Sequence, residues 1–227
     1  MGEMTMPGGW TMSMAWMRMP GQTWAGAAAS FLGMWSAMMV AMMLPSLAPM
    51  LSRYREAISV TAEKRLGRLT GLVALGYFVV WTGFGMAVFP LGVSLATIAM
   101  QHPLVARAVP VAVGAVVLIA GSFQLTAWKA RQLCCFREMP ERRMLAADAG
   151  SAWRHGLRLG LHCGRCCANL MAVLLVFGVM DLRAMAAVTG AITLERLAPD
   201  GGRVARAIGA VVVGAGLLLI ARAAGLA

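Results

Sequence analysis

The sequence predicts an all-α protein, a polytopic transmembrane helical bundle with five or six membrane helices. Of its 227 residues, 60% are hydrophobic and only 13% are charged. A soluble domain, in contrast, is about half apolar and about a quarter charged. The apolar residues also gather in runs near the roughly 20 residues that a helix needs to cross a bilayer. Most side chains are therefore expected to face lipid or other parts of the protein.

Six apolar windows are expected to form the helices. They lie near residues 31–51, 69–91, 108–128, 157–180, 182–194 and 204–220. The fifth window is short: at about 1.5 Å per residue it reaches only about 20 Å, so it must thin the bilayer, use flanking residues or stop short of crossing. Residues 31–227 are thus expected to form a single transmembrane domain, preceded by a Met-rich N-terminal segment, residues 1–30.

The basic residues predict how the chain is oriented in the membrane. The formal net charge is +11, and the cations lie between the apolar windows. The connections after the first and third windows hold Arg53, Arg55, Lys64, Arg65, Arg68, Lys129, Arg131, Arg137, Arg142, Arg143 and Arg154, and the one before the last window holds Arg196, Arg203 and Arg206. The positive-inside rule makes the connections after the first and third windows cytoplasmic and the N-terminal segment non-cytoplasmic. The connection before the last window is cytoplasmic if residues 182–194 cross the membrane. Since no basic stripe lies on a soluble face, the expected partner is the lipid bilayer and not nucleic acid.

The fourth window carries a cluster of thiols that points to metal binding. Cys163, Cys166 and Cys167 fall on one face of a helix at about 100° per residue. His162 lies at the edge of that face. Because the cluster lies on or near the reducing side of the membrane, a structural disulfide framework is disfavoured, and metal binding is the more specific interpretation. Cysteine also packs as a small apolar residue, so plain helix packing stays open as the alternative.

A second pair of cysteines, Cys134 and Cys135, lies in the connection after the third window. A thiol pair on the cytoplasmic side is a candidate metal-transfer site. An incidental pair near the membrane surface, or a palmitoylation-like site, is the alternative.

Methionine is concentrated near the N-terminus, where thirteen of the twenty methionines precede residue 51. Met38 and Met42 belong to one stripe of the first window, with Met43 beside it, and Met42 and Met43 should reach the depth of the cysteine cluster. Soft sulfur ligands favour Cu(I). Methionine also fills gaps in apolar cores, so core packing is the alternative. The candidate metal ligands are Cys163, Cys166, Cys167, Met38, Met42, Met43, His162, Cys134 and Cys135.

Two further features of the fourth window concern helix packing and charge. Gly156, Gly160 and Gly164 repeat at four-residue spacing, which permits a close approach of another helix. Arg165 points away from the cysteine face within the hydrocarbon region, so it needs a partner there. The nearest expected counter-ion is Glu195.

The sequence resembles the bacterial membrane proteins grouped as domain of unknown function 2182 (DUF2182), described as predicted metal-binding proteins and sometimes named copper chaperones. The resemblance is carried by Trp35-x-x-Met38-Met39-x-Ala41-Met42-Met43-Leu44-Pro45-Ser46-x-x-Pro49, by Gln124-x-x-x-Trp128-Lys129-x-x-x-Leu133-Cys134, and by Gly160-x-x-Cys163-x-x-Cys166-Cys167-x-x-Leu170-Met171. It departs at Arg165, where members often have glycine, and at Ala168, where they often have an aromatic residue. The resemblance implies a metal-handling protein of the bacterial inner membrane.

The expected function is therefore the handling of a transition metal, with Cu(I) as the favoured ion, by a chaperone, transporter or insertion factor. A copper-receiving protein or a larger membrane complex would be its partner. Two alternatives remain open: a metal-free accessory subunit of a membrane complex, and a membrane thiol oxidoreductase. The sequence shows no nucleotide-binding loop, catalytic triad or carboxylate pair, so it gives no support for enzymatic turnover.

Overall fold

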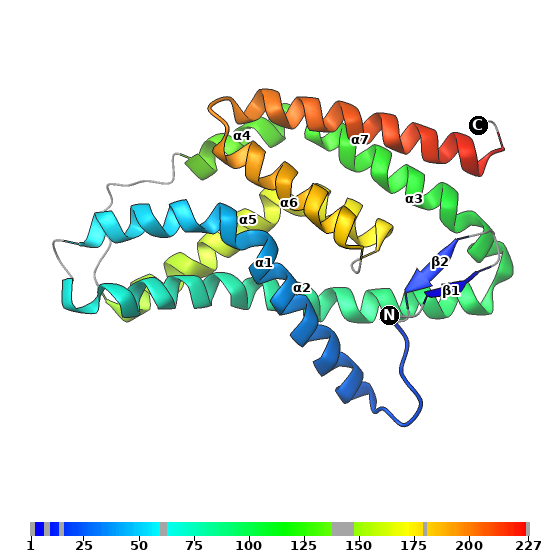
Figure 1. Ribbon diagram of the computed structural model, residues 1–227, viewed down its shortest axis with the longest axis horizontal. Coiled ribbons are helices and arrows are strands. Elements are labelled where there is room, and N and C mark those ends of the chain that lie inside the picture. Colours follow the sequence, from blue (N-terminus) through cyan, green and yellow to red (C-terminus); the bar gives the residue numbers. More distant parts are fainter. Residues whose placement is uncertain are drawn as a thin grey trace.

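The computed structural model is an elongated arrangement of helices that run mostly along one long axis (Figure 1). It describes residues 3–6, 10–13, 16–59, 63–137, 148–178 and 181–225. Within these residues the helices are α1 (Trp24–Ile58), α2 (Leu66–Gln101), α3 (Pro103–Gln124), α4 (Ala127–Arg137), α5 (Ala149–Phe177), α6 (Leu182–Leu197) and α7 (Gly201–Ala223), with a 3-10 turn, η2 (Glu63–Arg65), before α2. The all-α prediction is confirmed.

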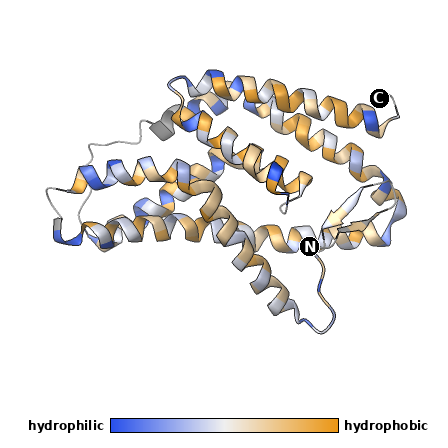
Figure 2. Cartoon of the chain, in the orientation of Figure 1, coloured by the Kyte–Doolittle hydropathy of each residue, from blue (hydrophilic) through white to orange (hydrophobic). Residues whose placement is uncertain are grey.

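Five helices, α1, α2, α3, α5 and α7, are long and apolar enough to cross a membrane. Hydrophobic residues cover most of α3 and α7, and the most hydrophilic ones gather toward the helix ends (Figure 2). The short window, 182–194, forms α6, which is not among the five. Its 16 residues extend about 24 Å, less than the roughly 30 Å of a hydrocarbon core. The compartment that each end faces remains a prediction.

Helices α2 and α5 lie side by side because glycines remove the side chains between them (Figure 1). A Cβ at Gly76 would meet the carbonyl oxygen of Trp153 at 2.9 Å, and one at Gly160 would meet that of Tyr77 at 2.9 Å. A Cβ at Gly156 would collide with the backbone of Val73. The predicted role of the glycine repeat in close helix packing is confirmed.

Gly156→Ala is expected to lower the free energy of unfolding by about 1–3 kcal/mol, the usual cost of overpacking a tight contact. Thermal unfolding of the purified protein in detergent measures this. The matched control is Gly83→Ala in α2, because a Cβ at Gly83 has no heavy atom within 4 Å. An equal loss in both variants would contradict the role of close α2–α5 contact.

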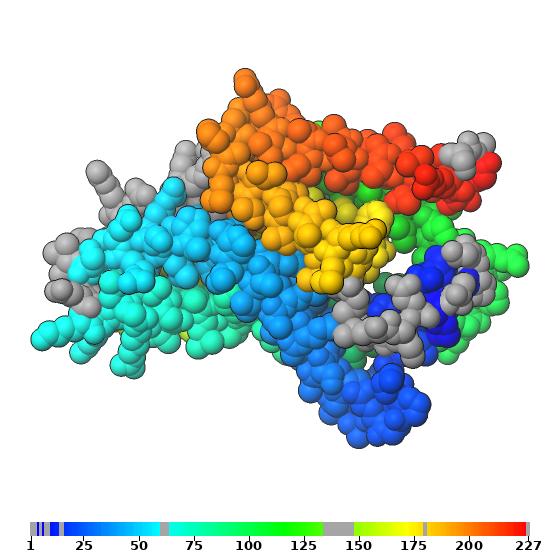
Figure 3. Space-filling model, viewed as in Figure 1, coloured from blue at the N-terminus to red at the C-terminus, as the bar shows by residue number. Residues whose placement is uncertain are grey.

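Helices α3 and α7 pack in the same way through Gly121 and Gly216. A Cβ at either position would meet a backbone nitrogen of the opposite helix at 2.7 Å. The two helices lie next to each other along most of their length (Figure 1). This pair forms one side of the protein, and α2 with α5 forms another. In the space-filling view, α7 lies along one long edge of the molecule (Figure 3).

Helix α1 bends midway along its length (Figure 1). Pro45 and Pro49 lie inside it, and each lacks the backbone N–H that would bond the carbonyl four residues earlier. Ser46, between them, is buried and donates its hydroxyl hydrogen to the carbonyl oxygen of Met43 at 3.0 Å. The bend therefore turns a polar side chain into the interior at the middle of an apolar helix.

The third predicted window, 108–128, is wrong at its C-terminal end. Helix α3 stops at Gln124 and α4 begins at Ala127. The hydroxyl of Thr126 donates to the carbonyl of Phe123 at 2.7 Å and accepts from the N–H of Lys129 at 3.4 Å. These hydrogen bonds stabilise the break, and the change of direction brings Lys129 into the interior, where 1% of it is exposed.

Helix α5 begins at an N-cap, Asp148. Its carboxylate accepts a hydrogen bond from the N–H of Ser151 at 3.0 Å. This backbone hydrogen bond holds the pKa of Asp148 below its usual value. The cap starts the helix about four turns before the cysteine cluster.

The N-terminal segment forms a small hairpin, in which β1 (Glu3–Thr5) pairs antiparallel with β2 (Thr11–Ser13). Met6 and Met12 are buried against Ala96 and Ala99 of α2. The indole N–H of Trp10 donates to the carbonyl of Ala106 at 2.9 Å. The hairpin thus covers the region where α2 turns into α3.

Candidate metal centre

The three cysteines of α5 are fully buried on one face of the helix. Their exposed fractions are 0% for Cys163, 1% for Cys166 and 1% for Cys167. All three are free thiols. Cys163 lies about one turn before the adjacent Cys166 and Cys167, which is why a single helix can direct three sulfur atoms into the same core.

The same core contains the methionines of α1. Met39, Met42 and Met43 are at most 2% exposed, and Met38 is 6% exposed. They belong to one continuous cluster with the three cysteines and with Met171 of α5. The structure therefore brings the thiols and the predicted thioethers into one core.

The guanidinium of Arg196, near the end of α6, contacts two of the thiols. One of its nitrogens, Nη2, donates to the Sγ atoms of Cys163 and Cys167, both at 2.9 Å. The other, Nη1, donates to the hydroxyl of Ser46 at 3.0 Å. A buried guanidinium stabilises negative charge on a sulfur that it contacts. This contact therefore favours the thiolate form, which is the form that binds metals.

A second hydroxyl reaches the cluster from α2. The hydroxyl oxygen of Tyr77 lies 2.9 Å from the Sγ of Cys163. Four helices, α1, α2, α5 and α6, thus supply the groups that surround the thiols. Tyr77, Ser46 and Arg196 were not among the candidate residues from the sequence.

Next to the thiols lies a buried chain of polar groups. The ammonium of Lys129 forms an ion pair with Glu195 at 2.8 Å and donates to the carbonyl oxygen of Cys166 at 2.7 Å. The amide of Gln124 donates to Glu195, and the amide of Asn169 donates to Gln124. Because Lys129 bonds the backbone of Cys166, this chain fixes the helix turn that carries the cysteines.

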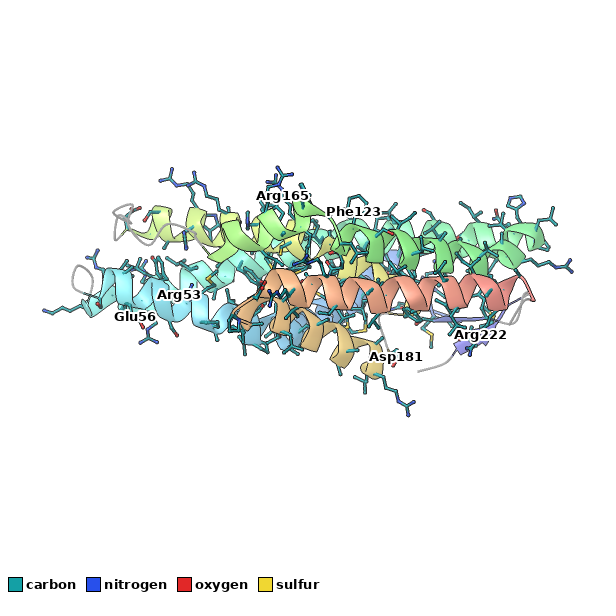
Figure 4. The ribbon with its side chains drawn as sticks, turned by 90° about the horizontal axis from the view of Figure 1, so that it is seen from above. Arg53, Glu56, Phe123, Arg165, Asp181 and Arg222 are labelled. Carbon is teal, nitrogen blue, oxygen red and sulfur yellow. The ribbon has the colours of Figure 1, made fainter. Side chains whose placement is uncertain are left out.

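The expected pairing of Arg165 with Glu195 is wrong. Glu195 is 2% exposed and pairs with Lys129. Arg165 is exposed, and Figure 4 shows it projecting outward from the helices. The sequence predicts that Lys129 lies in a cytoplasmic connection, whereas the break after α3 turns this cation inward, where it pairs with Glu195.

The remaining candidate ligands are placed less centrally. His162 is half-buried beside the cysteine face. Cys134 and Cys135 lie on α4, but their side chains are outside the described part of the structure. Their role as metal ligands stays a prediction.

The donor set suits a soft ion. In the described part of the chain, no group of three or more His, Cys, Asp or Glu side chains is arranged to hold a metal ion. Zinc usually takes four such ligands in a structural site. Cu(I), in contrast, accepts thiolates and thioethers, and both types of sulfur belong to this core. The thiols and thioethers of this core are thus sulfur ligands of the types that Cu(I) accepts.

The fold and the site define a helical protein with five helices long and apolar enough to cross a membrane and with sulfur side chains gathered in its interior. A family model described as a copper chaperone (PpoB2) matches residues 32–219. This range contains all three cysteines of α5 and the methionines of α1, and the chain belongs to this copper chaperone family. Comparisons with curated proteins and with solved structures found no match.

Proposed function

We propose that this protein binds Cu(I) inside its helical bundle and hands it on, as a membrane-embedded chaperone, transporter or insertion factor. The observation that carries the proposal is the contact of Arg196 with the sulfur atoms of Cys163 and Cys167. Two thiolates and one Cu(I) ion carry one net negative charge. The guanidinium supplies the compensating positive charge where the interior offers little solvation.

Each group has a part in this proposal. Cys163 and Cys167 would be the principal ligands, and Cys166 lies one position away as a further thiolate. Met38, Met42 and Met43 would contribute thioethers at the side facing α1. Tyr77 and Ser46 would hold the thiolate and the guanidinium in place, since each hydrogen-bonds one of them. Copper is cargo here, so its release is as necessary as its binding.

The membrane setting supports the same function. A charged side chain inside a transmembrane protein is costly and is usually retained for a function. Arg196 is 7% exposed and lies in the last turn of α6. Compensation of the negative charge of a metal–thiolate complex would explain why Arg196 is buried, which apolar packing alone does not explain.

Titration of the copper-free protein with Cu(I) in detergent, under reducing and anaerobic conditions, tests the proposal. We expect saturation near one ion per chain and an X-ray absorption spectrum at the copper edge with sulfur as the nearest neighbour. Zn(II) added in place of Cu(I) is the matched control and is expected to bind weakly. A spectrum with only oxygen and nitrogen neighbours, or no saturable binding, would refute Cu(I) handling at this site.

A further inference from the structure

A pocket of about 280 Å³ lies beside the thiols, between α1 and the turn from α6 to α7. It is lined by Ser46, Pro49, Met50, Arg53, Arg196, Leu197, Ala198 and Pro199. Its volume is at the lower end of that of small-molecule sites. It is therefore large enough for one end of a small molecule and too small for a folded protein domain.

Arg196 belongs both to the wall of this pocket and to the thiol cluster. Its guanidinium reaches Cys163 and Cys167 on one side. The hydroxyl of Ser46, which also lines the pocket, accepts a hydrogen bond from the other nitrogen, Nη1. The pocket and the sulfur atoms are thus connected through one side chain, so a ligand in the pocket is one residue away from the cysteines.

The side chains that line the pocket are basic and include one thioether. Arg53 and Arg196 are both cations, and the lining contains no acidic residue. The half-buried Met50 adds a thioether. Figure 4 shows that Arg53 lies toward the end of the molecule where α1 emerges from the bundle. A positively charged mouth raises the local concentration of anionic ligands and their rate of association.

We infer that this pocket is the entry site for copper and that it receives Cu(I) as an anionic complex with small thiolates. The inference depends on the proposed function, because it names the form in which that copper arrives. Arg53 attracts the complex at the mouth. Arg196 meets its negative charge at the inner end, and Met50 offers a soft ligand on the way.

The exchange at the cysteines is balanced without any redox step. A complex of one Cu(I) ion with two thiolates enters with one negative charge. Its two copper–sulfur bonds break as copper bonds to the Sγ atoms of Cys163 and Cys167. The two cysteine protons pass to the departing thiolates, which leave as neutral thiols. Copper stays Cu(I), and the negative charge stays on the bound complex beside Arg196.

Loading of the full-length, copper-free protein from two donors tests the inference. The anionic donor is Cu(I) with excess glutathione, and the cationic donor is Cu(I) in acetonitrile. Stopped-flow absorbance of the copper–thiolate band measures the loading rate. Arg53→Gln is expected to slow loading from the anionic donor by about three- to tenfold, because one steering charge is lost. Loading from the cationic donor should not slow, and Arg53→Lys should retain the normal rate.

Arg55→Gln is the matched control, because Arg55 is exposed on the same helix and does not line the pocket. Its loading rate from the Cu(I)–glutathione donor should remain within about twofold of that of the unmodified protein, because its charge lies outside the pocket. Equal slowing by Arg53→Gln and Arg55→Gln, or equal slowing with both donors, would overturn the entry site while leaving copper binding intact. A protein that loads from neither donor would overturn the proposed function itself.

Discussion

Replacing Cys163 and Cys167 together by serine is expected to weaken Cu(I) binding by more than about 100-fold. Loss of a group that only supports a metal ligand already costs about 10–100-fold in affinity, and serine is a hard oxygen ligand that Cu(I) does not favour. Both thiols are buried and contact Arg196. Competition with a coloured Cu(I) chelator measures the change.

The matched control is Ala168→Ser, which places the same side chain on the same helix at an exposed position outside the cysteine face. It should retain full affinity. Thermal unfolding checks that the double variant still folds. A folded double variant with unchanged copper affinity would leave Cys163 and Cys167 without a role in binding. In that case, the protein would be better explained as a metal-free accessory subunit of a membrane complex. An intramembrane disulfide found by thiol trapping would instead favour a thiol oxidoreductase.

Lys129→Met is expected to destabilise the protein by about 3–5 kcal/mol, because it leaves the carboxylate of Glu195 buried without its ion pair. The two side chains are 1% and 2% exposed, and their charged atoms lie 2.8 Å apart. The ammonium also bonds the carbonyl of Cys166, so copper affinity should fall as well. Thermal unfolding in detergent measures the first effect, and chelator competition measures the second.

A second variant separates the loss of the ion pair from the loss of the long side chain. Lys129→Met combined with Glu195→Gln removes both charges and should recover most of the lost stability, since a neutral buried pair costs much less than one uncompensated charge. An equally unstable double variant would mean that the packing of Lys129, and not its charge, holds α4 to the bundle.

The helices and their packing were predictable because they depend on local patterns. Apolar runs near twenty residues gave five of the helices, and the glycine spacing in α5 gave the close contact with α2. The cysteine spacing also placed three thiols on one buried face. Each of these predictions needs only the rise and rotation of a helix, which the order of residues along the chain determines.

The electrostatic partners were not predictable, since they depend on which helices meet. The sequence predicts that Arg196 lies in a connection between apolar windows, whereas its guanidinium reaches the thiols from the end of α6. Lys129 was assigned to a connection too, because the break after Gln124 is not apparent in an apolar run. A basic residue directly beside an acidic one at the end of a short helix, as in Glu195-Arg196, was the only local signal.

The bend in α1 separates two groups of side chains. The half before Pro45 carries the buried methionines that belong to the same core as the thiols, and the half after it carries Met50 and Arg53, which line the pocket. Two missing backbone hydrogen bonds make the joint between the halves softer than the rest of the helix. The part of α1 after the bend is still packed against the bundle, since Tyr54 and Ile58 are buried, so the bend sets the angle at which the pocket meets the sulfur-containing core.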